Sequence, residues 1–111
     1  MTRKWVKIFD SYKQGLSSLP DNKSILKFDD LQNFCLIKRK EKIYAFIEKC
    51  PHAGAKLISA SCNEDDKLVC PLHNMKFNIE TGKGNGYKLE TYPIEDRDDG
   101  VYVGLPKRGW F

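Results

Sequence analysis

The sequence predicts an all-β domain, and three observations lead to this prediction. Its 111 residues suit one domain, because domains most often have about 100–150 residues. Its apolar residues come in short alternating segments at intervals of about 8–12 residues, as in β-sandwiches and barrels. No window of about twelve residues carries an apolar stripe with the 3.6-residue period of a helix, so long helices are not expected.

Eight segments are predicted to be strands, because β-branched and aromatic residues alternate with polar ones in them. In chain order they are residues 5–9, 24–28, 33–37, 42–47, 67–70, 76–79, 88–92 and 100–103. Polar residues predict a hairpin turn at 39–42 and a further turn at 98–100. Residues 48–86 differ, since alternation weakens and two cysteine–histidine pairs, two prolines and four of the eight glycines occur there. We therefore expect a loop-rich subdomain inserted into a β framework.

Composition excludes several classes of protein. The longest apolar runs have four residues, whereas a membrane-spanning helix needs about 20 and a signal peptide about 7–15, so we expect a cytoplasmic protein that does not enter a membrane. The net charge is +4, but both signs are interleaved, so nucleic-acid binding is not expected. A mildly basic surface can instead steer an acidic protein partner. Without a secretory signal, four cysteines indicate metal or redox chemistry rather than a disulfide framework.

Two short motifs carry the candidate chemistry. They are Cys50-Pro51-His52 and Cys70-Pro71-Leu72-His73, and each follows a predicted strand. Structural zinc sites usually combine a cysteine pair with a histidine pair, or use at least three cysteines. Mixed pairs suit a 2Fe–2S cluster in which two thiolates hold one iron and two imidazoles hold the other. The candidate ligands are therefore Cys50, His52, Cys70 and His73, and a zinc-binding or redox-sensing module is an alternative.

On these motifs the sequence resembles the Rieske family. Residues 50–55 and 70–73 carry the specific resemblance, and residues 77–82, 92–94 and 99–103 extend it more weakly. The resemblance implies a single Rieske domain over 1–111 that binds one Rieske-type 2Fe–2S cluster. Its β-sandwich or barrel base would comprise about 1–47 and 87–111, and its cluster-binding subdomain about 48–86.

Differences within the family narrow the expected function. Catalytic oxygenase subunits add an iron held by two further histidines, and both histidines of this chain are already used. Membrane-anchored members carry an extra cysteine in each cluster loop, where this chain has Ala55 and Leu72. The resemblance implies a soluble ferredoxin, not an enzyme, that carries electrons from a separate flavin- or nicotinamide-dependent reductase to a terminal oxygenase. The small subunit of an assimilatory nitrite reductase, which would serve its large subunit, is the alternative.

Residues near the candidate ligands indicate a low reduction potential. High-potential family members have serine and tyrosine hydroxyls where this chain has Met75 and Phe77. Fewer donors to the cluster sulfurs stabilise the reduced state less, so we expect a midpoint near the lower limit of the Rieske range, about −150 mV. Cys35 and Cys62 are expected to be core or loop thiols rather than ligands.

Overall fold

The computed structural model describes residues 3–27, 29, 33–48, 60–70, 75–84 and 86–106. Within these residues the chain forms one helix, α1 (Tyr12–Ser18), and twelve strands. The strands are β1 (Arg3–Phe9), β2 (Ile25–Lys27), β3 (Phe34–Arg39), β4 (Lys42–Ile47), β5 (Ser61–Cys62), β6 (Lys67–Val69), β7 (Lys76–Asn78), β8 (Lys83–Gly84), β9 (Tyr87–Lys88), β10 (Thr91–Tyr92), β11 (Ile94–Arg97) and β12 (Gly100–Pro106).

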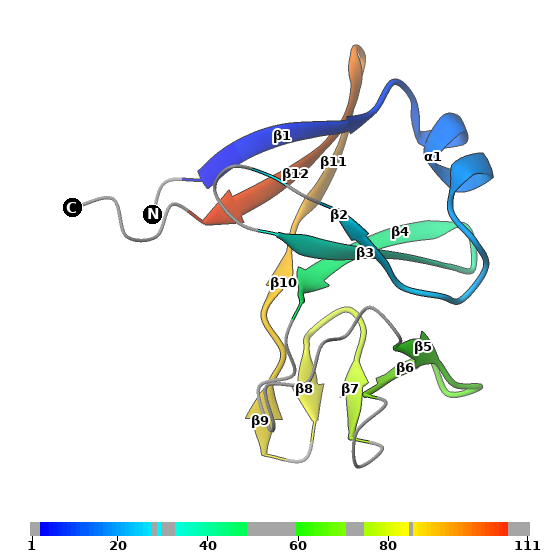
Figure 1. Cartoon of the computed structure of the whole chain (residues 1–111), viewed down its shortest axis with the longest axis vertical. Coiled ribbons are helices and arrows are strands. Elements are labelled where there is room, and N and C mark those ends of the chain that lie inside the picture. The colour runs from blue at the N-terminus through cyan, green and yellow to red at the C-terminus, as the bar shows by residue number, and fades with distance from the viewer. Residues whose placement is uncertain are drawn as a thin grey trace.

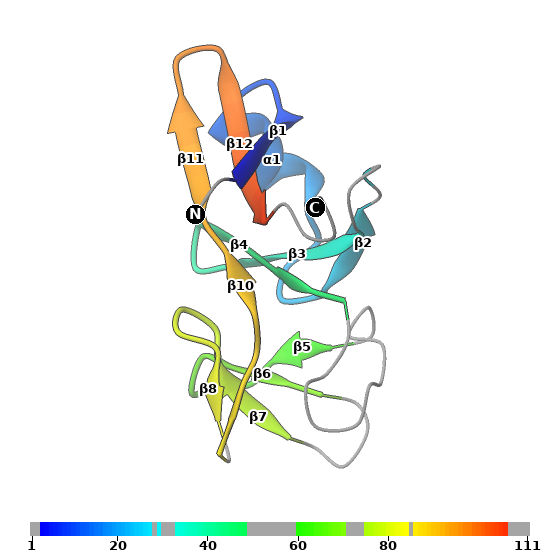
Figure 2. The same ribbon diagram turned by 90° about the vertical axis from the view of Figure 1, so that its left-hand side faces the viewer.

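The described strands form four antiparallel sheets, and the fold is all-β as predicted (Figure 1). Their strand orders are β1–β12–β11, β10–β4–β3–β2, β5–β6–β7 and β8–β9. The four-stranded sheet lies between the β1–β12–β11 sheet on one side and strands β5–β9 on the other (Figures 1 and 2). The chain is flat, with principal extents of 39 × 38 × 20 Å.

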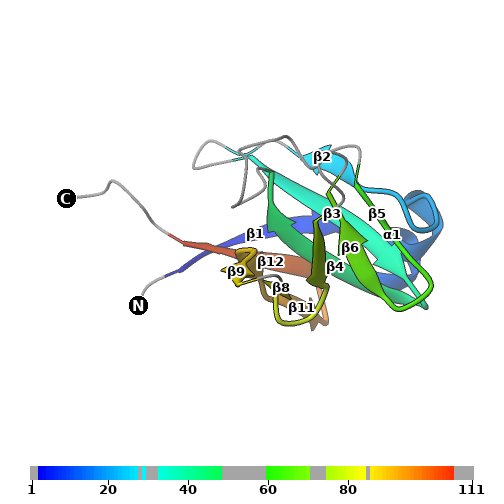
Figure 3. The ribbon, with the colours of Figure 1, turned by 90° about the horizontal axis from the view of Figure 1, so that it is seen from below.

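The four-stranded sheet separates two apolar cores. The first, here called the β1-side core, contains Phe9, Leu19, Phe34, Leu36, Ile43, Ala45, Tyr92, Val101, Val103 and Leu105. The second, here called the β7-side core, contains Cys35, Ile37, Phe46, Ala60, Cys62, Leu68, Cys70, Phe77, Ile79 and Leu89. Strand β3 supplies both cores, because successive side chains of a strand point to opposite faces. In the view from below, strands β5 and β6 lie across β3 and β4, on the side of the β7-side core (Figure 3).

The hairpin between β3 and β4 confirms the predicted turn at residues 39–42. Arg39 pairs with Lys42, so only Lys40 and Glu41 form the connection. Both have positive φ angles, 50° and 63°, as a two-residue type I′ turn requires. This turn matches the twist of the two strands, which places β4 directly beside β3 before the chain continues toward residue 50.

Helix α1 was not predicted, because its seven residues are too short to show a helical apolar stripe. Ser11 caps it, since the Ser11 Oγ accepts a hydrogen bond from the Gln14 amide at 3.1 Å. The helix packs closely on the β1-side core through Gly15, where an added Cβ would lie 2.7 Å from a Phe9 ring carbon. The Ile43 amide also donates to the Tyr12 hydroxyl at 2.8 Å, which ties α1 to β4.

Two other predictions needed correction. The expected strand at 88–92 is divided between β9 and β10, because Lys88 pairs with β8 whereas Thr91 and Tyr92 pair with β4. Strand β11 was missed because three of its four residues are charged, yet it pairs with β12 along its whole length. Its Arg97 guanidinium lies 5.0 Å from the Trp5 ring centroid and 4.4 Å from that of Tyr102, contacts that stabilise an exposed edge strand. The division into base and cluster-binding subdomain stays a prediction, and its boundary near residue 86 falls within the β8–β9 hairpin.

Candidate metal centre

Cys70 is the one predicted ligand that lies within the described residues. It directly follows β6, and its side chain is fully buried in the β7-side core. Its backbone amide donates to the Met75 carbonyl at 2.8 Å. This hydrogen bond links Cys70, just after the end of β6, to the residue that precedes β7.

Cys50, His52 and His73 lie outside the described residues. The described chain leads toward the first two through β4, whose last residue, Ile47, donates its amide to the Glu90 carbonyl at 2.9 Å. Because three predicted ligands fall in 49–59 and 71–74, the described part of the chain contains no group of three potential metal ligands. The ligand set therefore stays a prediction.

The buried position of Cys70 is compatible with an iron–sulfur ligand, and its place in the motif of residues 70–73 sets it apart from the similarly buried Cys35 and Cys62. Phe77 lies opposite Leu68 in the pairing of β6 with β7, and both side chains are fully buried. Met75 packs half-buried against the same core. A thiolate in apolar surroundings is unfavourable unless a cation compensates its charge, and a bound ferric iron would provide that compensation. Neither Met75 nor Phe77 carries a hydroxyl that could donate to a sulfur atom.

Cys35 and Cys62 are free thiols in the β7-side core, as expected from the sequence. Burial raises the pKa of each thiol to about 11. Both therefore stay protonated at neutral pH, which suits packing rather than metal binding. Asn22 has a positive backbone φ angle of 63°, and its side-chain amide donates to the Cys62 carbonyl at 2.7 Å, which holds β5 near the four-stranded sheet.

The β8–β9 hairpin is held tightly against β7. The Gly82 amide donates to the Asn78 carbonyl at 2.7 Å, and the Leu89 amide donates to the Gly82 carbonyl at 2.6 Å. Gly82 has a φ angle of +80°, and an added Cβ would collide with the Leu89 carbonyl oxygen. Gly84 packs equally closely on the Lys76 carbonyl. The chain from 82 to 84 thus runs back along β7 from Asn78 to Lys76, so the hairpin turn lies at the Cys70 end of β7.

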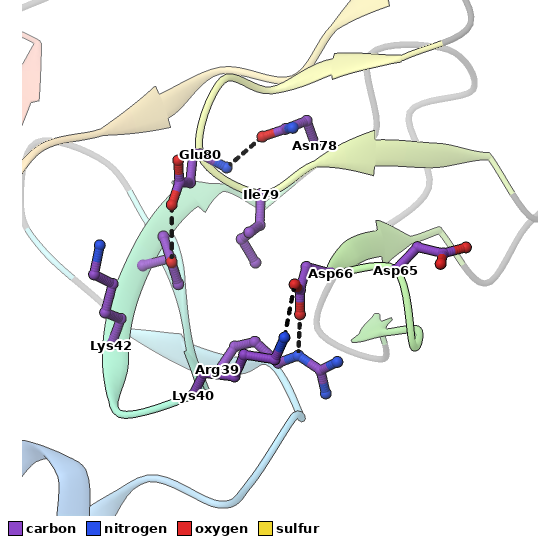
Figure 4. Close-up of a pocket in the computed structure, with 9 residues that line it drawn as sticks. Arg39, Lys40, Lys42, Asp65, Asp66, Asn78, Ile79 and Glu80 are labelled. Carbon is purple, nitrogen blue, oxygen red and sulfur yellow. Dashed lines mark hydrogen bonds and ion pairs between the residues drawn. The ribbon is translucent and has the colours of Figure 1, made fainter.

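An ion-pair network joins the β3–β4 hairpin to the turn between β5 and β6 (Figure 4). Arg39 Nε lies 2.8 Å and Lys40 Nζ 3.0 Å from the Asp66 carboxylate, and these contacts lower the pKa of Asp66. Arg39 also donates to the Asn63 carbonyl at 3.0 Å. The network borders a cavity of about 460 Å³, whose cationic and anionic side chains compensate each other. The sequence did not reveal it, because 27 positions separate Arg39 from Asp66.

The fold and the buried cysteine after β6 together indicate the class of protein: an all-β domain with a candidate metal site that uses a thiolate ligand. A sequence profile of the Rieske [2Fe-2S] domain matches residues 13–93. The chain therefore belongs to the Rieske family, and its cofactor is one Rieske-type 2Fe–2S cluster.

Two relatives of known description are similar in sequence to this chain. The ferredoxin component of the alkene monooxygenase system of Xanthobacter autotrophicus is 30% identical over 80 residues, which cover 67% of this chain and 66% of the relative, just under two thirds of its length. The 3-phenylpropionate/cinnamic acid dioxygenase ferredoxin subunit of Escherichia coli is 25% identical over 100 residues, which cover 86% of this chain and 93% of the relative.

Solved structures confirm the fold. The ferredoxin of carbazole 1,9a-dioxygenase from Nocardioides aromaticivorans superposes with a TM-score of 0.71 and 20% identity, over 96% of this chain and 100% of that chain. A Mycobacterium tuberculosis structure described as an NADH-dependent nitrite reductase small subunit gives a TM-score of 0.75 with 14% identity, over 96% and 98%. At these identities the likeness concerns the fold alone.

Proposed function

We propose that the protein is a soluble Rieske-type ferredoxin that carries single electrons from a separate reductase to a terminal oxygenase, and is not itself an enzyme. The observation that carries this proposal is that the two relatives described above are ferredoxin components of oxygenase systems, one of them aligned over 93% of its length. A flavin- or nicotinamide-dependent reductase is the proposed donor. A cytoplasmic location fits the described residues, in which no helix is long and apolar enough to cross a membrane.

The proposed ligands are Cys50 and Cys70 for one iron and His52 and His73 for the other. When bound there, the cluster supplies one-electron chemistry, and neutral imidazoles give it a higher potential than an all-cysteine cluster has. The chain contributes the position of Cys70, which β6 and the Met75 hydrogen bond hold inside an apolar core. The β7-side core excludes water from this thiolate. The proposed cluster-binding subdomain, about 48–86, includes Cys70 and strands β5 to β8.

Metal and sulfide analysis tests the site. Freshly purified protein should contain two irons and two acid-labile sulfides per chain. His52→Cys should lower the midpoint potential in any cluster that assembles, because it replaces a neutral ligand with an anionic one. Stoichiometric zinc in protein that has not been reconstituted would contradict the proposal.

Partner kinetics separate the two candidate functions. The likeness in fold to the nitrite reductase small subunit keeps that alternative open. A ferredoxin should exist apart from its acceptor and be oxidised at a rate that depends on the concentration of an oxygenase. Co-purification with a nitrite reductase large subunit in fixed stoichiometry would instead favour the alternative.

A further inference from the structure

One segment with a net positive charge lies beside the candidate ligand Cys70. Residues 67–89 hold four lysines and one acidic residue, Glu80. The rest of the chain holds the other fifteen basic and fourteen acidic residues, out of 19 and 15 in all, and is nearly neutral. Strands β6 to β9, next to Cys70, therefore carry four lysines against one carboxylate, and residues 1–9 form a second basic segment with Arg3, Lys4 and Lys7.

Lys83 and Lys88 form a like-charge pair. They stand directly opposite each other in the β8–β9 hairpin, and both are exposed. Among the described residues neither lysine makes an ion pair, whereas Lys4, Lys7, Lys38 and Lys40 all do. Like charges directly opposite each other in a β-ladder repel, so this lysine pair lowers the stability of the β8–β9 hairpin. The only nearby acid in the segment, Glu80, accepts a hydrogen bond from the Tyr44 hydroxyl at 3.5 Å.

An exposed aromatic residue completes this surface, here called the basic hairpin: Lys83, Tyr87 and Lys88. Tyr87 is 44% exposed and is the sole large apolar side chain among the described residues that is exposed. Lys76 adjoins the hairpin, because Gly84 packs on its carbonyl. Tyrosine is enriched at protein interfaces, where its ring supplies contact area at a low entropic cost.

We propose that the basic hairpin docks a carboxylate-rich surface of a protein that exchanges electrons with this chain. The proposal rests on the proposed function and adds the place and the chemistry of recognition. The hairpin turn lies at the Cys70 end of β7, so a partner seated there is close to the candidate ligand. Its carboxylates would relieve the repulsion between Lys83 and Lys88, and Tyr87 would supply apolar contact. A protein suits this small footprint better than nucleic acid, because affinity for a nucleic acid depends on neutralising many phosphates and the hairpin offers two lysines.

Binding of poly-L-glutamate to the oxidised, cluster-containing protein tests the surface. The variant Lys83→Gln/Lys88→Gln should bind about fivefold more weakly at low ionic strength, and the difference should vanish in about 1 M salt. The matched control is Lys13→Gln/Lys42→Gln, which removes the same charge from two exposed lysines without ion pairs in the described structure. Equal weakening in both variants, or none in either, would overturn the proposal.

Three further measurements complete the test. Thermal unfolding of the hairpin variant should occur at an equal or higher temperature than in the wild type, because the like-charge pair is gone; a clear loss of stability would contradict the proposed repulsion. Oxidation of the reduced protein by ferricyanide, which accepts one electron to become ferrocyanide, should slow in the hairpin variant more than in the control. Tighter binding of phosphatidylglycerol vesicles or a single-stranded oligonucleotide than of poly-L-glutamate, through the same lysines, would overturn the choice of a protein partner.

The same samples separate failure of this proposal from failure of the proposed function. Protein that lacks iron and sulfide contradicts the ferredoxin assignment, whatever it binds. Cluster-containing protein whose poly-L-glutamate affinity does not depend on Lys83 and Lys88 contradicts the docking surface alone.

Discussion

Met75 and Phe77 bring apolar side chains to the neighbourhood of Cys70. The Met75 carbonyl accepts a hydrogen bond from the Cys70 amide, and the Phe77 side chain packs in the same core as Cys70. A hydroxyl at either position would be sheltered from water, where a hydrogen bond to a charged acceptor is strong. The two positions are therefore suitable places from which to raise the potential of the cluster.

The variant Met75→Ser/Phe77→Tyr should have a higher midpoint potential than the wild type. A hydrogen bond worth about 1 kcal/mol in the reduced state shifts a one-electron midpoint by about 40 mV. Protein-film voltammetry measures this shift directly. Phe9→Tyr, which adds a hydroxyl on the β1-side core, is the control and should leave the midpoint unchanged. A wild-type midpoint well above 0 mV would show that other dipoles dominate.

The buried thiols of Cys35 and Cys62 predict a loss of stability in alkali. Their pKa is about 11 in the folded chain, against an ordinary value of 9.0. Below about pH 9 the thiols are protonated in both states and the folded chain keeps its full stability. As the pH rises from about 9 to about 11, the unfolded chain loses these protons first, so the free energy of unfolding falls.

Urea unfolding at several pH values between 8 and 11 checks this prediction. The wild type should lose stability steadily across this range, whereas Cys35→Ala/Cys62→Ala, although less stable at pH 8, should lose less on going to pH 11. Parallel slopes for the two proteins would show that these thiols do not account for the alkaline loss.

At the scale of secondary structure, strands with alternating apolar residues were predicted well. Strand β4 has the predicted bounds, and β1, β3, β6 and β7 differ from prediction by two residues or fewer at each end. These strands each bury one or both faces, so the hydrophobic pattern and the structure agree. Strand β11 was missed because its residues are charged, and pairing with β12 and stacking of Arg97 override its low propensity.

Helix α1 could have been found from a different signal. Ser11 and Gln14 have the spacing of a capping box, in which the first side chain caps the helix and the second reaches back to a free amide. In the structure the Gln14 side chain accepts from the Asp10 amide at 2.7 Å. For the candidate site, sequence motifs predict four ligands, of which Cys70 lies within the described residues, whereas the Arg39–Asp66 contact depends on distant segments that only the folded chain brings together.

The turn between β3 and β4 offers a stabilising substitution. Glu41 has a φ angle of 63°, which is unfavourable for residues other than glycine, asparagine and aspartate. Glu41→Gly should raise the free energy of unfolding by about 0.5–1 kcal/mol, because relief of this strain outweighs the added entropy of the unfolded chain. Chemical denaturation measures the change. Lys42→Gly, one residue later and inside β4, is the control and should lower stability.

For the whole molecule, the two cores predict unequal responses to loss of the cluster. Cys70 belongs to the β7-side core, whereas β1 and β12 are joined through the β1-side core. Because metal binding stabilises the elements that hold the ligands, apoprotein should lose hydrogen-exchange protection mainly in β6 and β7.

Exchange followed by mass spectrometry in holoprotein and apoprotein measures this difference by segment. Peptides from β1 and β12 should retain most of their protection after iron is removed. An equal loss throughout the described strands would show that the chain unfolds as one cooperative unit.

Strand β3 is apolar on both faces at residues 34–37, and this affects how its pairing register with the neighbouring strands is determined. In most antiparallel strands a slip by one residue would expose apolar side chains to water, and that penalty enforces the correct pairing. Here a slip would exchange Phe34 and Leu36 with Cys35 and Ile37 between two equally dry environments. Exposure to water therefore does not favour one register over the other, and the two-residue turn at Lys40 and Glu41 has to set the register. Lengthening this turn by one residue would produce compact but misaligned molecules rather than unfolded ones.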